Sequence, residues 1–171
     1  QQCGTMPHMK RLLQIVSITA VLLFGLFLLL AFTNTTAQPV KTVYTPNQLL
    51  AEANKLRAEK GVAPLVLDER LNQSAQWKAD DMVKTGVNHV SSDGALGHLK
   101  INVYAPKVCK YISENIASNP KFDNPYDKVD GWPTSVKHYE AILDTKYETT
   151  GFGVKVIDNN VYYVQHFCDL K

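Results

Sequence analysis

Four of the five histidines carry most of the chemistry that this 171-residue chain offers, because imidazole gains and loses a proton near neutral pH. His89 lies in a loop-like stretch, Asn-His-Val-Ser-Ser-Asp-Gly, and Glu114 begins a later Glu-Asn-Ile-Ala segment. Ser135 and His138 would share one face if their segment is helical. A serine beside a histidine suggests nucleophilic catalysis, but side chains at this spacing leave a helix roughly parallel, which is awkward for a catalytic triad. The other two are His98 and His166.

The motifs of several enzyme classes are absent from the sequence. It contains no G-x-S-x-G nucleophile elbow, P-loop, G-x-G-x-x-G, H-E-x-x-H or C-x-x-C. His138 and Glu140 form the H-x-E of zinc deaminases, but the P-C-x-x-C partner is missing. A lone histidine is usually structural, so these histidines need a common pattern before any of them is assigned a role.

The net charge of +2 comes from the N-terminus alone. Lys10 and Arg11 are the only bases before residue 38, no acid precedes that residue, and the rest of the chain is charge-balanced. Nucleic-acid binding needs clustered cations that displace counterions, and no such stripe is present. We therefore exclude a nucleic-acid partner. An apolar content of 45% and a charged content of 20% are typical of one globular domain.

The N-terminal segment has the pattern of an export signal. Lys10 and Arg11 precede residues 12–32, which are apolar apart from three polar positions. As a helix this run would span about 30 Å, the hydrocarbon thickness of a bilayer, whereas its strictly apolar part, 20–32, has the length of a signal-peptide core. Small residues at 35 and 37 fit cleavage before residue 38. The pattern does not distinguish a cleaved signal from a membrane anchor, and a buried core helix is the remaining alternative.

These observations predict four parts of the chain. Residues 1–8 are a leader or vector-derived, 9–37 are a signal peptide or N-terminal membrane anchor, 38–44 are a linker, and 45–171 are one folded domain. The protein would be extracellular or in the cell envelope, and attached to the membrane through its N-terminal segment if that segment is retained. Cys109 and Cys168 are the two cysteines of the exported part, and an oxidising compartment favours a disulfide over two buried thiols.

The elements that must position the histidines are helices followed by a hairpin. Thr45-Pro46 with Gln48 forms a capping box that opens a helix ending near Gly61, and Asp68 opens a second that ends near Gly86. We expect a structured loop over 87–108, a short helix or turn over 109–117, and a helix over 132–143. Two β-prone runs, 152–157 and 161–167, flank an Asp-Asn-Asn turn. This order predicts an α+β fold with helices packed on a sheet.

Five segments in order resemble the CAP superfamily, which comprises cysteine-rich secretory proteins, antigen 5 and plant pathogenesis-related 1, in its bacterial SCP-like form. The segments are the first helix with Lys-Gly-Val-Ala-Pro-Leu, the histidine loop ending in Ser-x-Asp-Gly, Glu-Asn-Ile-Ala, Trp-x-x-Ser-x-x-His-x-x-x-Ile-Leu, and the closing Gly-Phe-Gly-Val and Tyr-Val-Gln strands. The resemblance covers about residues 46–168. It implies a three-layer α-β-α sandwich with a mostly antiparallel central sheet and a C-terminal hairpin.

The resemblance also implies a cleft lined by His89, His138 and Glu114. Some members of the superfamily bind a divalent ion such as zinc through the two histidines, and a carboxylate and water can complete a tetrahedral site. A second cleft acid of eukaryotic members is Ser135 here, and an arginine common in bacterial relatives is Tyr139. Loss of that carboxylate weakens any acid–base proposal. His98 and His166 match no cleft position, and we interpret both as structural or surface residues.

Three functions are compatible with this interpretation. The first is a cell-surface or secreted binding module whose cleft holds a metal or small ligand and whose surface recognises an envelope, lipid or protein component. The second is an extracellular hydrolase, protease-like or esterase-like, with His89 or His138 as general base, Glu114 orienting it, and water or Ser135 as nucleophile. The third is a structural or adhesive role. A fold alone does not decide between them.

Overall fold

The computed structural model describes residues 43–119 and 124–170. The chain divides between residues 40 and 41 into two units, and all described residues belong to the second. The predicted leader, the predicted signal or anchor and most of the predicted linker lie outside the described residues. Within the described ranges, none of the helices has both the length and the apolar character needed to cross a membrane.

The two long helices begin where the capping signals predict. Helix α2 (Pro46–Glu59) opens with a complete capping box, in which the Thr45 hydroxyl accepts from the Gln48 N–H and the Gln48 side chain accepts from the Thr45 N–H. Helix α3 (Glu69–Thr85) opens at Asp68, whose carboxylate accepts from the backbone N–H of Arg70 at 2.9 Å. These bonds join neighbouring residues, so the start of each helix is encoded locally in the sequence.

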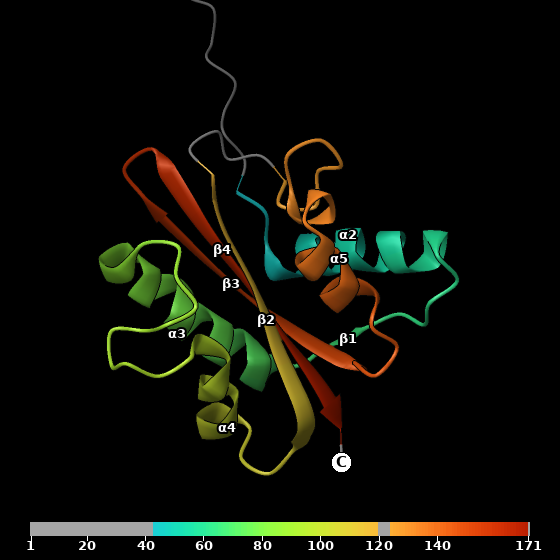
Figure 1. The fold of residues 1–171 in the computed structure, drawn as a ribbon, viewed down its shortest axis with the longest axis horizontal. Helices are drawn as coiled ribbons and strands as arrows, with labels where there is room; N and C mark the ends of the chain where they lie inside the picture. Colours follow the sequence, from blue (N-terminus) through green and yellow to red (C-terminus); the bar gives the residue numbers. More distant parts are fainter. Residues whose placement is uncertain (1–42, 120–123, 171) are drawn as a thin grey trace, which may run out of the picture. The chain divides into compact units, whose positions relative to one another are not determined.

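One four-stranded sheet forms the centre of the domain, with strand order β1-β3-β4-β2 (Figure 1). Strand β1 (Val66–Leu67) runs parallel to β3 (Thr149–Ile157), and the other neighbours are antiparallel. Strand β4 (Asn160–Leu170) forms the predicted hairpin with β3 and pairs on its other side with β2 (Cys109–Asn119). The mostly antiparallel sheet is therefore confirmed.

The prediction of a short helix or turn over 109–117 is wrong, because these residues form most of strand β2. Alternate residues of β2 face opposite sides of the sheet. Ile112 and Ile116 pack with the α3 side, and Ala117 packs with the other core. Glu114 and Asn115, which are polar, lie between these apolar residues and are buried. The alternation of apolar and polar residues that predicts a strand is therefore missing from this segment of the sequence.

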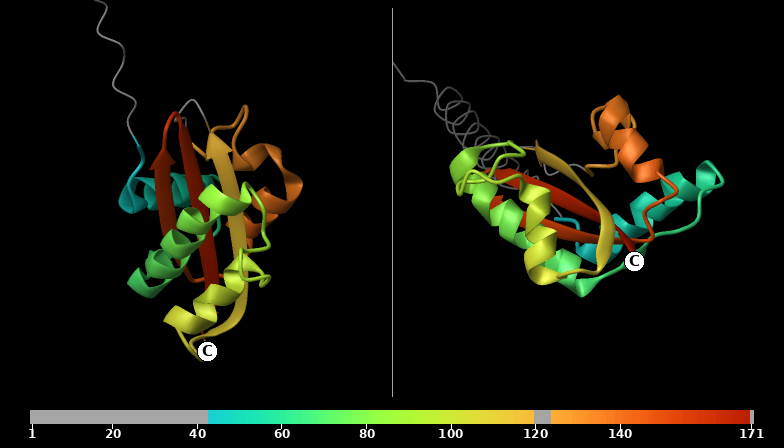
Figure 2. Two further views of the ribbon diagram at one scale, coloured as in Figure 1. Left: turned by 90° about the vertical axis from the view of Figure 1, so that its left-hand side faces the viewer. Right: turned by 60° about the horizontal axis from the view of Figure 1, so that its bottom comes forward.

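Helices cover both faces of the sheet (Figure 2). Strand β4 shows the division, since Tyr163 and Phe167 belong to the core beneath α2 and α5 (Val136–Leu143), whereas Val164 and Cys168 belong to the cores beneath α3 and α4 (Ile101–Tyr104). This arrangement confirms the α+β fold and is the three-layer order that the resemblance implies.

Short elements replace two of the predicted segments. The loop predicted over 87–108 contains the 3-10 helix η1 (Gly97–Lys100) and α4. The helix predicted over 132–143 is divided into the 3-10 helix η2 (Trp132–Thr134) and α5, because Ser135 is extended, with φ −98° and ψ 122°. Ser135 is thus the N-cap residue of α5, where its backbone lies outside the helix.

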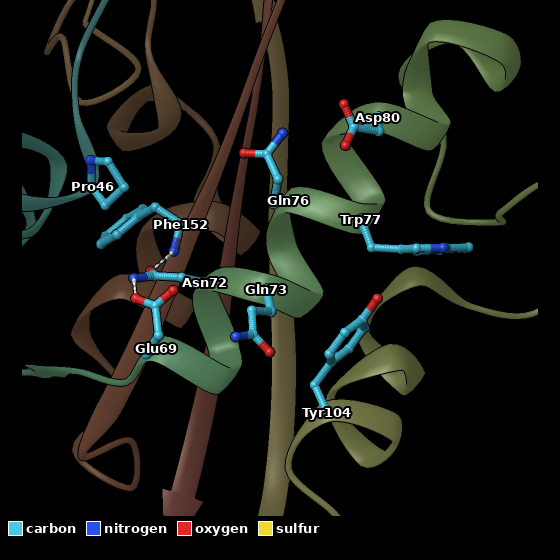
Figure 3. A pocket seen from close by; sticks show the side chains of 9 residues that line it. All are labelled: Pro46, Glu69, Asn72, Gln73, Gln76, Trp77, Asp80, Tyr104 and Phe152. Carbon is cyan, nitrogen blue, oxygen red and sulfur yellow. Dashed lines mark hydrogen bonds between the residues drawn. The ribbon is translucent and has the colours of Figure 1, made fainter.

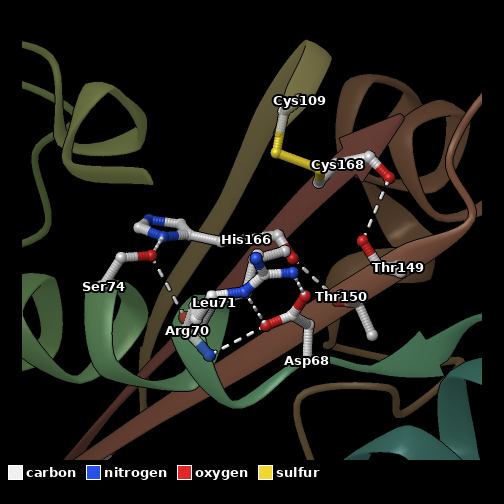
Figure 4. The surroundings of a disulfide bond; sticks show 9 residues. All are labelled: Asp68, Arg70, Leu71, Ser74, Cys109, Thr149, Thr150, His166 and Cys168. Carbon is white, nitrogen blue, oxygen red and sulfur yellow. Dashed lines mark hydrogen bonds and ion pairs between the residues drawn. A yellow bond between two sulfur atoms is a disulfide. The ribbon is translucent and has the colours of Figure 1, made fainter. Parts of the chain in front are cut away.

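A disulfide joins Cys109 to Cys168, as predicted (Figure 4). Cys168 lies in β4 and pairs in register with Ile112 of β2. The bond therefore links the two neighbouring strands that carry the polar cluster described below.

Helix α3 packs directly on β3. A Cβ atom at Gly151 or Gly153 would overlap the backbone of α3, so only glycine permits this approach. The side-chain oxygens of Asn72 and Gln76 accept from the backbone N–H groups of Phe152 and Val154, at 2.8 and 3.1 Å. Amide side chains of the helix thus occupy hydrogen-bonding positions that a further strand would otherwise take along β3.

Candidate functional site

Glu114 is the centre of a polar cluster on the α3 side of the sheet. It pairs in register with His166 of β4, and its Oε2 lies 2.9 Å from His166 Nε2. Its Oε1 lies 2.7 Å from His89 Nδ1. The carboxylate is buried, so both of its oxygens are held by imidazole nitrogens rather than by solvent.

The charge of Glu114 depends on these two contacts. Burial by itself raises the pKa of a carboxyl group, since it disfavours the charged form. The hydrogen bonds to His166 and His89, and the electrostatic attraction of the same two imidazoles, outweigh burial and lower the pKa of Glu114 to about 2. The group is therefore a carboxylate at any physiological pH and accepts hydrogen bonds from both histidines.

His89 is the accessible member of the cluster. Its side chain is 49% exposed, in contrast to the 1% of the Glu114 side chain. Because Nδ1 donates to the carboxylate, the other ring nitrogen, Nε2, is the one available to a ligand. Nε2 carries a lone pair in the neutral ring and a proton in the charged ring. A buried carboxylate that orients a histidine in this way is a common arrangement at both metal-binding and catalytic histidines.

His166 anchors the carboxylate from inside the protein. Its ring is fully buried, and Nδ1 lies 2.7 Å from the hydroxyl oxygen of Ser74 on α3 (Figure 4). The same hydroxyl lies 3.1 Å from the carbonyl oxygen of Leu71. A hydroxyl has one proton to donate. If it donates to Leu71, His166 must donate from both nitrogens and is charged; if it donates to His166, the ring is neutral and gives its only proton to Glu114.

His166 is predicted to be a structural or surface residue, and the structure contradicts the surface alternative. The residue is at the centre of the domain and not at the surface, and it belongs to the cluster around Glu114. The sequence does not reveal this position. Counting inward from the bond between Cys109 and Cys168 would set residue 166 opposite Tyr111, whereas the structure pairs it with Glu114 because the register shifts near Cys109.

The loop that carries His89 is held by a buried pair on α3. Lys78 is fully buried, and its ammonium group lies 3.2 Å from the Ser91 hydroxyl and 3.8 Å from the Asp81 carboxylate. Asp81 in turn accepts from the backbone N–H and the hydroxyl of Ser92. The loop is closed by a hydrogen bond of 2.7 Å from the Gly97 N–H to the His89 carbonyl. Fixing the loop backbone in this way fixes the imidazole against Glu114.

His138 approaches β2 from its other face. Asn115, the neighbour of Glu114, points toward α5 and donates to the His138 carbonyl at 3.0 Å. Burial and, to a smaller extent, the charge of His89 lower the pKa of His138. No hydrogen bond between His138 and Glu114 is found in the described residues. The structure thus brings His89 and Glu114 into contact, whereas His138 is linked to β2 through Asn115.

Ser135 and His138 line a common pocket of about 260 Å³ between α5 and the end of β2. No hydrogen bond between the serine and the histidine is found among the described residues, and a catalytic role for Ser135 stays a prediction. His98 is half-buried near the cluster, where burial lowers its pKa and the charge of Glu114 opposes that effect. Its position is compatible with the predicted structural role.

The arrangement does not fit a zinc site. A structural or catalytic zinc ion needs at least three protein ligands that converge on one point. No group of three or more His, Cys, Asp or Glu side chains suited to a metal occurs within 43–119 and 124–170. Both oxygens of Glu114 are engaged by imidazoles, which leaves the carboxylate to orient His89 rather than to bind an ion. Zinc binding by His89, His138 and Glu114 stays a prediction from the resemblance alone.

Known proteins resemble this chain in sequence over most of the described domain. The model of the cysteine-rich secretory protein family, CAP, matches residues 50–167. The chain is 29% identical over 137 residues to the uncharacterised protein YkwD of Bacillus subtilis (strain 168), covering 79% of this chain and 51% of that protein. It is 33% identical over 122 residues to the uncharacterised membrane protein YlbC of the same strain, covering 70% of this chain and 33% of that protein. The chain thus spans about half the length of the first relative and a third of the second.

A solved structure with a similar fold is that of an outer surface protein from Borrelia burgdorferi. Its TM-score is 0.64 at 23% sequence identity, and the match covers 73% of this chain and 92% of that one. At this level of identity the likeness shows a shared fold.

Proposed function

Because the chain belongs to the cysteine-rich secretory protein family, we propose that it is an exported binding module that captures a polar ligand at the exposed imidazole of His89. Export is supported by the disulfide between Cys109 and Cys168, which persists in oxidising compartments. The apolar N-terminal segment of the sequence and the outer surface location in the name of the Borrelia burgdorferi structure agree with it.

The observation that carries the binding proposal is the contrast in exposure within one hydrogen-bonded pair. Glu114 is buried and held by His166, and it presents a half-exposed His89 with Nε2 free to bind. A side chain oriented beforehand loses little conformational freedom when a ligand binds. The Nε2 atom would accept from a hydroxyl or amide when the ring is neutral, and would donate to a carbonyl or an anion when the ring is charged.

Titration with soluble fragments of a bacterial cell envelope tests this function, with the full chain labelled with ¹⁵N and the imidazole nitrogens observed by NMR. We expect the Nε2 resonance of His89 to shift on binding, and we expect His89→Ala to lose most of the affinity. Lys128→Ala, which alters an exposed ion pair with Glu59 outside the cluster, is the matched control and should bind like the wild type. Binding that is equal in all three proteins would place recognition elsewhere on the surface, as in an adhesive role.

A second candidate function is hydrolysis, favoured by the 2.7 Å contact between His89 Nδ1 and Glu114. In this function His89 Nε2 takes a proton from a water molecule that attacks a carbonyl carbon, and Glu114 stabilises the resulting imidazolium. Ser135 is not the nucleophile in this proposal, since it has no hydrogen bond to His138 among the described residues. Turnover of an ester or peptide substrate should disappear in both His89→Ala and Glu114→Gln. Activity that survives either change would exclude this mechanism.

A further inference from the structure

A second hollow lies on the outer face of α3, away from the histidine cluster. It has a volume of about 540 Å³, within the range of about 300–1,000 Å³ that is usual for small-molecule sites. Figure 3 shows its floor along α3 and a wall formed by Tyr104 of α4 on one side. Its lining includes Asn72, Gln73, Gln76, Trp77, Asp80 and Tyr104.

Trp77 is held in one orientation at this hollow. The Lys100 ammonium lies 4.1 Å from the centre of the indole ring, and Asp93 holds that ammonium at 2.6 Å. Lys100 is not among the residues that line this hollow or its neighbour, whereas Trp77 lines both. The cation–π contact restrains the indole at one place, and the ring still lines both hollows. An aromatic surface that is already ordered binds a flat apolar face at a lower entropic cost.

Polar groups with unused hydrogen-bonding capacity surround the indole. Within the described residues no hydrogen bond is found for the Gln73 amide or the Tyr104 hydroxyl, and Gln76 uses only its oxygen, which accepts from Val154. Figure 3 shows the Gln73 side chain extending from α3 and the Tyr104 ring extending from α4. An amide offers donors and an acceptor side by side, which suits neighbouring hydroxyl groups that both donate and accept.

The hydrogen bonds of the neighbouring strand argue against a peptide ligand. An extended peptide usually adds to a free strand edge through backbone hydrogen bonds. The N–H groups of Phe152 and Val154 already donate to Asn72 and Gln76, so this edge is closed to strand addition. A peptide in the hollow would therefore lack the contacts on which that mode of binding depends.

The charges around the hollow argue for a neutral ligand. Asp80 forms an ion pair of 2.9 Å with Lys155, and Glu69 accepts from Asn72 at 2.9 Å. The hollow itself is lined by two carboxylates, Glu69 and Asp80, and by no base, so a phosphorylated polymer would be repelled, while Lys155 offsets one of the two charges and a polycation gains little.

A further hollow of about 440 Å³ shares Trp77 and Asp80 with the one described above, so the two follow each other along α3. A ligand that occupies both would be elongated and would cross the indole near its middle.

We propose that this face of α3 is a binding site for a neutral oligosaccharide, with one sugar ring stacked on Trp77 and hydroxyl groups of the neighbouring rings bonded to Gln73, Gln76 and Tyr104. The C–H groups on one face of a pyranose ring pack on the electron-rich face of an indole, while its hydroxyl groups point outward to amides and carboxylates. The site does not depend on His89, and it would hold the protein on a glycan surface whatever the histidine cluster binds.

The test is calorimetric titration of the full chain with a panel of neutral and N-acetylated oligosaccharides of three to six units, with uncharged peptides of similar length as a comparison. We expect binding of at least one oligosaccharide, a shift in the fluorescence of Trp77, and a loss of affinity of about tenfold or more in Trp77→Ala. The only other tryptophan, Trp132, is buried and gives a constant background.

Three further variants sharpen the result. Gln73→Ala alters an exposed side chain and should weaken binding without changing the unfolding temperature, which covers the case in which Trp77→Ala fails to fold. Tyr111→Ala removes an exposed aromatic ring outside the hollow and should bind like the wild type. His89→Ala should also bind normally, which separates this site from the proposed function. Absence of oligosaccharide binding at millimolar concentration, preference for the peptides, or equal affinity in Trp77→Ala and Tyr111→Ala would overturn the proposal.

Discussion

Replacing Glu114 by glutamine should destabilise the protein by about 3 kcal/mol at pH 7. The substitution keeps the shape of the side chain and removes the charge that both imidazoles contact. The magnitude follows from the pKa of the carboxyl group, which falls from 4.5 in the unfolded chain to about 2 in the folded protein. Each tenfold change in proton affinity corresponds to about 1.4 kcal/mol, so the charged form stabilises the folded state by about 3 kcal/mol.

The same shift predicts how this stabilisation depends on pH. A carboxyl group with a lowered pKa in the folded state contributes fully above its unfolded pKa of 4.5, and the contribution is lost as the pH falls toward 2. The wild type and Glu114→Gln should therefore differ most at pH 5–7 and converge in acid. Above pH 5 the Glu114 carboxyl group adds nothing to the pH dependence of the free energy of unfolding.

Urea unfolding followed by circular dichroism between pH 3 and pH 7 measures both effects. Glu140→Gln is the matched control, since Glu140 is exposed and makes no hydrogen bond or ion pair among the described residues. Glu140→Gln should lower the free energy of unfolding by less than about 0.5 kcal/mol. If Glu114→Gln costs no more than this control at pH 7, or if the gap between the wild type and Glu114→Gln stays constant down to pH 3, the carboxylate does not hold the cluster together.

Three other changes test the fold that supports the site. Replacing Cys109 and Cys168 by serine opens a loop with a sequence separation of 59 and should cost about 4 kcal/mol, which thermal unfolding with and without reductant would measure; the reductant should not affect the double variant. Gly153→Ala should cost about 3 kcal/mol or prevent folding, because its Cβ would overlap the backbone at Ala75, and normal stability would show that the helix can move away. Gln76→Ala leaves the strand N–H that it binds without this partner, so we expect a loss of about 1 kcal/mol and concentration-dependent association in light scattering; a variant that stays monomeric would contradict the second part.

Features encoded over a few neighbouring residues can be predicted from the sequence. The capping box at Thr45, the cap at Asp68 and the turn between the last two strands each depend on local geometry, and the structure has all three. The disulfide follows from the number of cysteines and the compartment rather than from geometry. His89 and Glu114 are selected through the family resemblance, and the structure places them in contact.

Features created by pairing of distant strands cannot be predicted in this way. Strand β2 has buried polar residues in its alternation, and their burial is tolerated only because partners lie across the sheet and on α3. His166 is 52 residues from Glu114 in the sequence, and its role depends on the register between β2 and β4. Seen alone, it is one more polar residue in a strand.

The amides of α3 that bind β3 limit the mutations that this helix can tolerate. Asn72 and Gln76 are one helical turn apart, an advance of about 6 Å, and they reach alternate residues of a strand, an advance of about 6.6 Å. The spacing of the two amides along the helix therefore nearly equals the spacing of their partners along the strand. A single inserted or deleted residue between the two amides would turn one of them by about 100° away from its strand partner. A length change in α3, which is far from β3 in the sequence, would thus act as a mutation of the sheet edge, and we expect this helix to accept substitutions more readily than insertions.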